Sequence, residues 1–252
     1  MILGIKNIGT FKKKISFVNN IVNECNFNFE EDKLFISEID VNNENLLFLN
    51  FEKKYFSSYQ FIEKKSFNIN LYNFYRCLKK ISIKNNLLLI FSDNNLQILG
   101  QTKSKKQIYN IEISLSTNNS SISILRESLL VYNNIIEIHD GLLNNLDLQC
   151  FLGFQIKEIS FLISNKKLTL TSKNEDIEIT KDIKDLKFKK FTNYNIESSF
   201  KIKSIYNIFS FFKLFDVKIL SMNNNSPLRV ELSSEHCQLV LTTSNLNDRK
   251  KT

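Results

Sequence analysis

The chain has 252 residues, 42% of them hydrophobic and 22 of them phenylalanine, which supplies enough apolar surface for one large core or two of ordinary size. Lysine and arginine outnumber aspartate and glutamate by 34 to 26, and the net charge of +8 favours polyanionic partners such as nucleic acid or an acidic membrane surface. A general compositional bias toward lysine and asparagine accounts for this charge equally well. No apolar run reaches the ~20 residues that span a bilayer, and the first residues lack the pattern of a signal peptide, so we expect a soluble intracellular protein.

Four segments have the apolar spacing of amphipathic helices. In the first, a stripe of apolar residues faces one side, and lysine, serine and asparagine occupy the other sides. The same pattern recurs three times along the chain. The predicted helices cover residues 10–24, 70–81, about 141–151 and about 201–213.

Most of the remaining chain has the pattern of short strands, rich in Ile, Leu and Phe and bounded by Asn, Asp, Ser and Lys. The predicted strands include residues 33–39, 87–91, 96–100, 108–115, 158–164, 167–172, 175–180 and 217–222. The single proline, Pro227, follows three asparagines in the stretch SMNNNSPLRVEL. Asparagine tolerates left-handed backbone angles and proline lacks an N–H donor, so we expect a turn here with Pro227 at the start of a strand.

The order of these elements repeats along the chain. The second helix leads into the hairpin LLLIF-SDNN-LQILG, and the fourth leads into VKILSM-NNNSP-LRVEL. The hairpin turns and the glycines before the first and third helices, Gly9 and Gly141, each recur at an interval of about 130 residues. This indicates a tandem duplication in which each half holds two helices and a set of strands.

The residues that usually carry catalysis are scarce. Only His139 and His236 are present, and neither a phosphate-binding loop nor a dinucleotide-binding motif occurs. His236 is adjacent to Cys237, but neighbouring side chains of a strand point to opposite faces, so we expect a surface histidine and a buried thiol. We therefore expect no enzymatic activity and no catalytic residues.

The four cysteines give no sign of a cross-linked framework or a metal centre. Cys25, Cys77, Cys150 and Cys237 are widely separated and include no CxxC pair. We expect buried or half-buried thiols, no metal and no cofactor.

The outward faces of the predicted helices are basic. Small uncharged residues separate the cations, a pattern that suits nonspecific binding to phosphates as well as a merely solvated helix face. The candidate DNA-binding residues are Lys12, Lys13, Arg76, Lys79, Lys80, Lys203 and Lys213.

Four segments spread over nearly the whole chain resemble the eukaryotic and archaeal sliding clamp family, whose best-known member is the proliferating cell nuclear antigen (PCNA). They are FKKKISFVNNIVNEC (11–25), LFISEIDVNNENLLFLNF (34–51), NLYNFYRCLKKI (70–81) and FKIKSIYNIFSFFKLFDVKILSMNNNSPLRVEL (200–232). The last is the most specific, because a helix, a strand, a polar turn and Pro-Leu-x-Val-Glu follow one another.

The resemblance implies an α+β fold, the DNA clamp or processivity fold. It implies two topologically similar domains, each with two helices packed on antiparallel sheets, and a ring in which helices line the hole. Residues 1–115 and 133–252 would form the domains, and residues 116–132 the connecting linker. Three identical subunits would join head to tail through Tyr109, Ile111 and Ile113 of one edge strand and Ile177 and Ile179 of another.

By the same resemblance, the ring encircles duplex DNA without reading its sequence and acts as a DNA polymerase processivity factor in replication and repair, in the nucleus or another DNA-containing compartment. Its expected partners are DNA polymerase, the clamp loader, a flap nuclease and ligase, which bind through short apolar peptides. No membrane partner is expected. The peptide groove would include Ile39, Leu125 and Pro227.

Several positions depart from the family pattern. Asn145 and Leu148 stand where arginines are expected on the third helix, Glu127 replaces an apolar linker residue, and the chain ends in LVLTTSNLNDRKKT without the usual apolar close. Residues 182–191 are basic in a family that is mostly acidic. Two alternatives therefore stay open: a subunit of a heterotrimeric checkpoint-type clamp, and a basic nucleic-acid-binding protein that does not encircle DNA.

Overall fold

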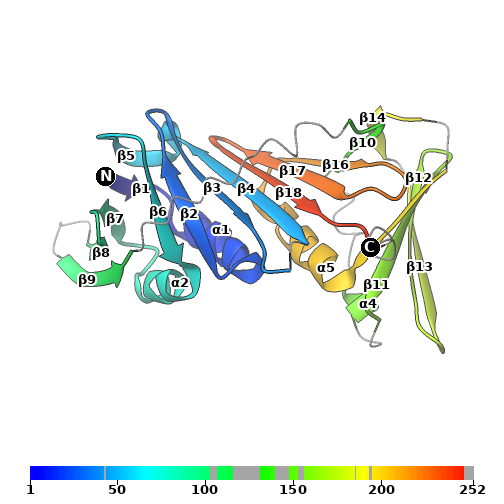
Figure 1. Cartoon of the computed structure of the whole chain (residues 1–252), viewed down its shortest axis with the longest axis horizontal. Helices are drawn as coiled ribbons and strands as arrows, with labels where there is room; N and C mark the ends of the chain where they lie inside the picture. Colours follow the sequence, from blue (N-terminus) through cyan, green and yellow to red (C-terminus); the bar gives the residue numbers. More distant parts are fainter. Residues whose placement is uncertain are drawn as a thin grey trace. The chain divides into compact units, whose positions relative to one another are not determined.

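The computed structural model describes residues 1–42, 44–102, 107–115, 131–139, 148–152, 156–184, 186–192 and 195–246. The chain forms two compact units (Figure 1). Unit 1 consists of Met1–Ile122 with Glu235–Leu239, and unit 2 consists of Ser123–Ser234 with Val240–Thr252. Within the described residues, no helix combines the length and the apolar character needed to cross a membrane.

In its described residues, unit 1 contains two α-helices and strands of two antiparallel sheets. The helices are α1 (Ile8–Ile21) and α2 (Leu71–Lys80), and a short 3-10 helix, η1, covers Lys53–Tyr55. One sheet has the strand order β5-β1-β7-β8-β9, and β6, β2, β3 and β4 lie side by side in the other. The strands are β1 (Ile2–Ile5), β2 (Glu24–Phe29), β3 (Lys33–Ile39), β4 (Asn45–Glu52), β5 (Phe56–Gln60), β6 (Lys65–Asn70), β7 (Asn86–Phe91), β8 (Asn95–Gln101) and β9 (Gln107–Ser114).

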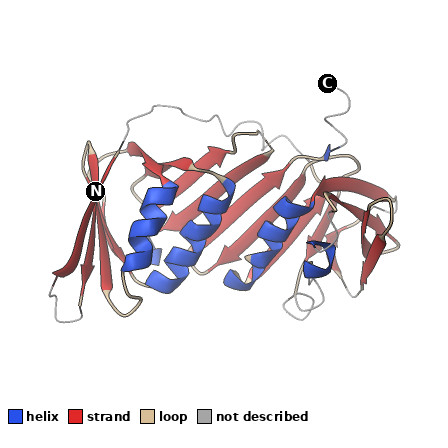
Figure 2. Ribbon diagram, turned by 90° about the horizontal axis from the view of Figure 1, so that it is seen from below, coloured by secondary structure: helices blue, strands red, loops and turns tan. Residues whose placement is uncertain are grey.

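The core of unit 1 lies between its helices and its sheets. Figure 2 shows α1 and α2 side by side across the strands, and the two helices pack against each other. Phenylalanine rings pack helices against strands. The ring centroids of Phe11 in α1 and Phe51 in β4 lie 5.9 Å apart, and those of Phe27 in β2 and Phe74 in α2 lie 5.8 Å apart in an edge-on arrangement. All four side chains are fully buried, so aromatic packing fixes the inward faces of both helices.

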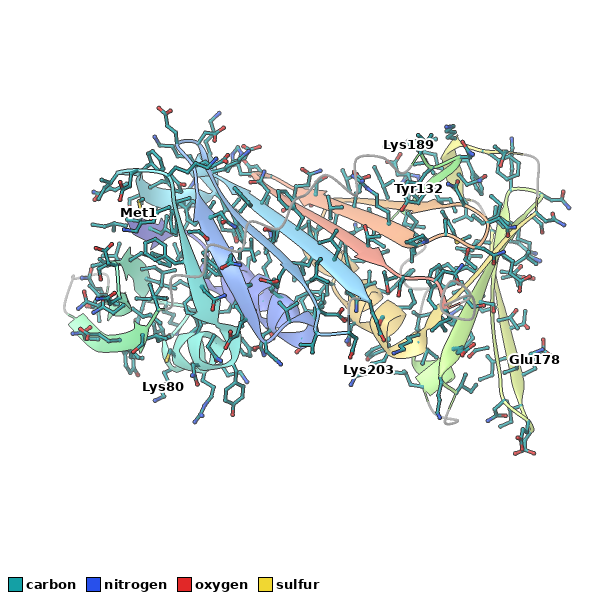
Figure 3. The ribbon with its side chains drawn as sticks, in the orientation of Figure 1. Met1, Lys80, Tyr132, Glu178, Lys189 and Lys203 are labelled. Carbon is teal, nitrogen blue, oxygen red and sulfur yellow. The ribbon has the colours of Figure 1, made fainter. Side chains whose placement is uncertain are left out.

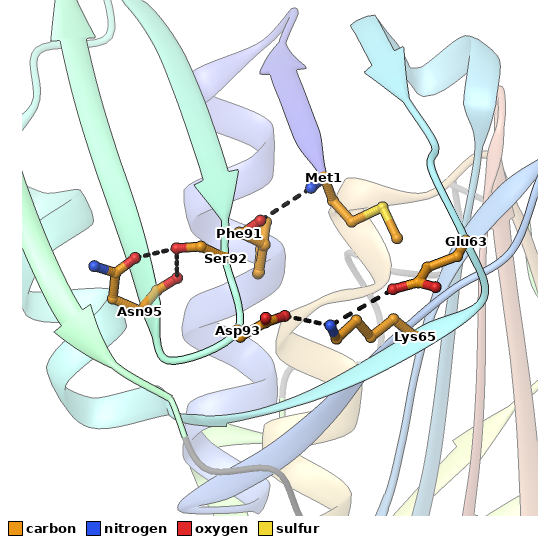
Figure 4. A network of polar contacts seen from close by, with 7 residues as sticks. All are labelled: Met1, Glu63, Lys65, Phe91, Ser92, Asp93 and Asn95. Carbon is orange, nitrogen blue, oxygen red and sulfur yellow. Dashed lines mark hydrogen bonds and ion pairs between the residues drawn. The ribbon is translucent and has the colours of Figure 1, made fainter.

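The β7–β8 turn has the predicted asparagine-rich chemistry. The Ser92 hydroxyl donates to the Asn95 carbonyl oxygen at 3.1 Å and also contacts the Asn95 side chain (Figure 4). Lys65 of β6 pairs with Asp93 at the tip of this turn and thereby holds the pKa of the Asp93 carboxyl below its ordinary value. Side-chain contacts therefore close the hairpin without a glycine.

Unit 2 repeats the plan of unit 1 in its described parts. A four-stranded antiparallel sheet has the order β13-β12-β11-β15, and β14, β10, β16 and β17 lie side by side in a second sheet. The helical segments are α4 (Gln149–Leu152), α5 (Ile202–Ser210) and the 3-10 helix η3 (Phe212–Leu214). The strands are β10 (Asn134–Glu137), β11 (Glu158–Ser164), β12 (Lys167–Lys173), β13 (Glu178–Ile183), β14 (Lys187–Lys190), β15 (Ile196–Lys201), β16 (Val217–Met222), β17 (Leu228–Ser234) and β18 (Cys237–Thr243), the last of which is divided between the units.

Aromatic rings again join helix to sheet in unit 2. The ring centroid of Phe161 in β11 lies 5.4 Å from that of Phe200 in β15 and 6.3 Å from that of Phe209 in α5. Phe209 stacks on Phe212 with a centroid separation of 4.5 Å.

The β16–β17 turn is the one predicted around the single proline. Asn225 adopts a φ of 49°, and Pro227 immediately precedes β17.

Candidate nucleic-acid interface

The lysines of α1 have three different environments. Asn7 caps the helix by accepting a hydrogen bond from the Thr10 N–H at 3.0 Å. Lys12 is half-buried, and its amine donates to the Ile81 carbonyl oxygen just beyond the end of α2. Burial lowers the pKa of Lys12, whereas the Lys13 side chain is exposed. The contact of Lys12 places a positive charge at the negative end of the α2 dipole, so part of its role is structural.

Lys14, which is not among the predicted DNA-binding residues, is only 2% exposed. Its amine lies 5.0 Å from the ring centroid of Tyr55 and 6.0 Å from that of Phe51, a cation–π arrangement in a desolvated setting. Burial raises the pKa of the neighbouring Cys237 thiol, and Lys14 opposes this shift. The signal was present in the sequence, because Lys14 falls three residues after Phe11 on the apolar stripe.

The second helix, α2, presents a basic face. Asn70 caps it by accepting from the Asn73 N–H at 3.0 Å, and the apolar side of the helix is fully buried. Arg76, Lys79 and Lys80 are all exposed, and the ten residues of the helix include no acidic side chain. The structure therefore leaves these three predicted cations available to a polyanion, and Figure 3 labels Lys80 among them.

A hollow of 390 Å³ lies between α2 and the strand β9. The helix contributes Arg76, Cys77 and Lys80 to its wall, and β9 contributes Glu112 and Ile113. Burial raises the pKa of the Cys77 thiol, which the two neighbouring cations partly oppose. The hollow is open, its walls are partly polar and partly apolar, and it adjoins an edge of the five-stranded sheet.

Both strands that were expected to join subunits are edge strands. Strand β9 is the last strand of the five-stranded sheet, and β13 is the first of the four-stranded sheet. Tyr109, Ile111 and Ile113 are half-buried on one face of β9, alternating with exposed polar residues. On the other edge, Ile179 lies in β13 and Ile177 directly precedes it, both half-buried.

The cations predicted in unit 2 are exposed, on the helical side of that unit. Lys203 lies in the first turn of α5, and Lys213 lies in η3. Lys189 of β14 lies on the opposite side of unit 2 from Lys203 (Figure 3). In β14, the Nζ atoms of Lys187 and Lys189 lie 3.0 Å and 3.6 Å from Glu137 Oε2. Lys189 of the basic segment 182–191 is therefore separate from the basic face of α5.

The remaining predicted positions are placed in part. Ile39, at the end of β3, is 38% exposed, and Pro227 is half-buried. Leu125, most of the linker 116–132 and most of the third predicted helix lie outside the described residues; α4 covers Gln149–Leu152, at the end of that predicted segment. Cys237 is buried as expected. His236 stands in the turn before β18 rather than in the strand, with a φ of 60°, and its Nδ1 lies 3.0 Å from Glu52 Oε2.

Comparisons with known proteins agree with this architecture. Residues 3–122 match the family model described as the proliferating cell nuclear antigen, N-terminal domain. No curated protein sequence matches the chain significantly. Among solved structures, PCNA from Entamoeba histolytica has a TM-score of 0.82 at 19% identity, covering 97% of this chain and 98% of its own.

Two archaeal structures are similar to nearly the same degree. The PCNA2–PCNA3 complex from Sulfolobus tokodaii gives a TM-score of 0.81 at 14% identity, with 98% of this chain and 99% of that chain covered. PCNA from Thermococcus kodakaraensis gives 0.80 at 16% identity, with 97% and 99% covered. The resemblance to the sliding clamp family is confirmed, as is the two-domain α+β clamp fold with antiparallel sheets.

Proposed function

We propose that this chain is the subunit of a sliding clamp, which encircles duplex DNA as a homotrimeric ring and tethers replication and repair enzymes. The observation that carries the proposal is the position of β9 and β13. Each is the edge of its sheet among the described strands; β9 carries Ile111 and Ile113 on one face, and Ile177 and Ile179 alternate at the start of β13. An unpaired edge of this kind is a template for another strand, and head-to-tail pairing that closes into a ring leaves neither edge free.

The exposed cations of α1, α2 and α5 would contact the DNA phosphates. Such contacts carry no sequence information and weaken with salt, which suits a protein that must slide. In this proposal Lys13, Arg76, Lys79 and Lys80 act from unit 1 and Lys203 and Lys213 from unit 2, and Lys12 contributes in addition to its contact with Ile81. The protein acts by topology and tethering and performs no chemistry itself.

The partners follow from the same proposal. DNA polymerase, a clamp loader, a flap nuclease and ligase would each insert a short apolar peptide, with Ile39, Leu125 and Pro227 among the contacts. The ring would work in the nucleus or another DNA-containing compartment. The domain limits at 115 and 133 stay a prediction of the resemblance.

Retention on DNA tests the encirclement. The chain is loaded onto closed circular duplex DNA with a clamp loader, and the DNA is then cut once. A ring stays on the circle and leaves the linear product by sliding off its ends, whereas a protein that binds without encircling remains on both. Equal retention on the two forms would refute the proposal and support the non-encircling alternative.

Charge reversal tests the DNA-facing side. The variant R76E/K79E should lower retention on circular DNA, because it replaces two exposed cations with anions, while the oligomer mass stays unchanged. The matched control is K53E/K54E, which makes the same change of charge at two exposed lysines of η1 in the same unit. An equal effect of both variants would show that total charge, and not the face of α2, governs binding.

A heterotrimeric clamp is the second candidate. One of the similar structures is a complex of two different clamp proteins, PCNA2 and PCNA3. The mass of the purified chain in solution separates the candidates. A stable trimer of this chain alone favours the homotrimer, and a chain that remains a monomer at all concentrations favours the mixed ring.

A further inference from the structure

The exposed face of α2 carries two tyrosine rings among its cations. Tyr72 is 57% exposed, and Tyr75 is half-buried. The Arg76 guanidinium carbon lies 5.4 Å from the centroid of the Tyr72 ring, and the Lys79 amine lies 4.5 Å from the centroid of the Tyr75 ring. Both distances fall within the ~6 Å of a cation–π contact. The helix thus exposes two pairs, each of one aromatic ring and one cation.

The two pairs lie next to each other on the helix. Tyr72 and Tyr75 are three residues apart, which corresponds to about 60° around the helix axis and ~4.5 Å along it. Each cation follows its ring by four residues, so the rings and cations alternate over one surface. This spacing lets two neighbouring flat groups of one ligand reach the two rings together.

Contact with duplex phosphates does not call for these rings. Phosphate binding needs cations and hydrogen-bond donors, and inside a duplex the base faces are stacked on one another and closed to side chains. An unpaired base offers a free π-face, and proteins that hold single strands combine such rings with a basic surface. The absence of any acidic residue in α2 completes the charge complementarity to a polyanion.

We propose that Tyr72, Tyr75, Arg76 and Lys79 form a binding site for single-stranded nucleic acid, in which unpaired bases stack on the tyrosines and the cations contact the flanking phosphates. The site rests on the proposed function in taking nucleic acid as its ligand, but it needs no ring closure. It gives the protein a preference for gaps or for junctions between single-stranded and double-stranded DNA over continuous duplex.

A tryptophan reporter tests the contact directly. The chain contains no tryptophan, so Tyr72→Trp introduces a single indole at the proposed stacking position. Titration with a thymidine homopolymer should quench its emission, and a blunt duplex of the same length should not. Quenching by both ligands, or by neither, would overturn the proposal.

Affinity measurements supply the second arm. Fluorescence anisotropy of labelled single strands should show about tenfold weaker binding for Y72A/Y75A, while the affinity for duplex changes by less than about twofold. The control Y72F/Y75F keeps both rings and should bind as the unmodified chain does. Circular dichroism and thermal melting of each variant confirm that the helix is intact. An equal loss for single strand and duplex, or no loss for the alanine variant, would refute stacking.

These outcomes are independent of the clamp proposal. A trimer that encircles DNA yet shows no quenching refutes the stacking site alone. A chain that fails to encircle DNA yet binds single strands through the two rings refutes the clamp and supports the site.

Discussion

Replacing Ile111 with lysine should break the proposed ring into folded monomers. Ile111 lies in register with Ile98 on β8 and is only half-buried, because no strand lies on its other side within the described part of the chain. At a subunit junction the remaining apolar surface would be covered by the neighbouring chain. A lysine at this position would place an unpaired ammonium group in that junction.

The size of the effect follows from two contributions. Covering the exposed half of an isoleucine side chain stabilises by about 1 kcal/mol, and this gain is lost in I111K. Desolvating an unpaired ammonium costs about 3 kcal/mol or more. The sum of about 4 kcal/mol per junction corresponds to a dissociation constant weaker by about three decades. The same reasoning applies to a lysine at Ile177 or Ile179 on the other edge.

Sedimentation equilibrium over a dilution series measures this directly. The unmodified chain should show three times its mass of 29.6 kDa, and I111K should show 29.6 kDa. The matched control is Q60K, because Gln60 is an exposed residue of β5, the opposite edge of the same sheet. A trimer of I111K at every concentration, or equal dissociation of Q60K, would show that β9 is not the joining edge.

Three further predictions concern unit 1. Phe27→Ala should lower the free energy of unfolding by about 3–5 kcal/mol in urea denaturation, because Phe27 is fully buried and packs edge-on against Phe74; a loss below about 1 kcal/mol would contradict this packing. Asn70→Ala should cost about 1 kcal/mol in the same assay through loss of the α2 cap, and Asn70→Ser should retain most of that stability. Because burial raises the pKa of Cys77, its alkylation at pH 8 should be slower than that of free cysteine and should accelerate as the pH rises above 9. Cys25 is completely buried and should react only after the protein unfolds. Equal alkylation rates of the two thiols, measured by peptide mapping, would disprove this order.

Helices and strands could be predicted because their apolar periodicity survives into the fold. The segment 158–164 is a strand with these same limits, and the predicted helix 70–81 is found at Leu71–Lys80. The ends of helices and strands were harder to predict where they depend on local hydrogen bonds. The first helix begins at Ile8 rather than residue 10 because the Asn7 side chain caps it.

A local hydrogen-bonded turn also explains why β13 starts later than the sequence predicts. The sequence predicts a strand at 175–180, whereas β13 covers Glu178–Ile183. The Asn174 side chain accepts hydrogen bonds from the N–H groups of Asp176 and Ile177 at 3.0 Å and 2.8 Å, which forms a turn where the strand was expected to start. Periodicity also cannot say which strand ends a sheet, because that depends on pairings between distant segments; the edge positions of β9 and β13 came from the resemblance.

Counting charges along the sequence overestimates how much of α1 can face DNA. Three successive lysines, Lys12, Lys13 and Lys14, point in directions about 100° apart. Lys13 is exposed, Lys12 contacts the end of α2 and Lys14 is buried. On α2, in contrast, Arg76 and Lys79 are three residues apart and share one exposed face. In the proposed clamp, α2 would therefore contribute more to the DNA contact of unit 1 than α1. Reversing Lys13 alone should weaken DNA retention less than reversing Arg76 alone, and the opposite order would place α1 at the centre of the contact.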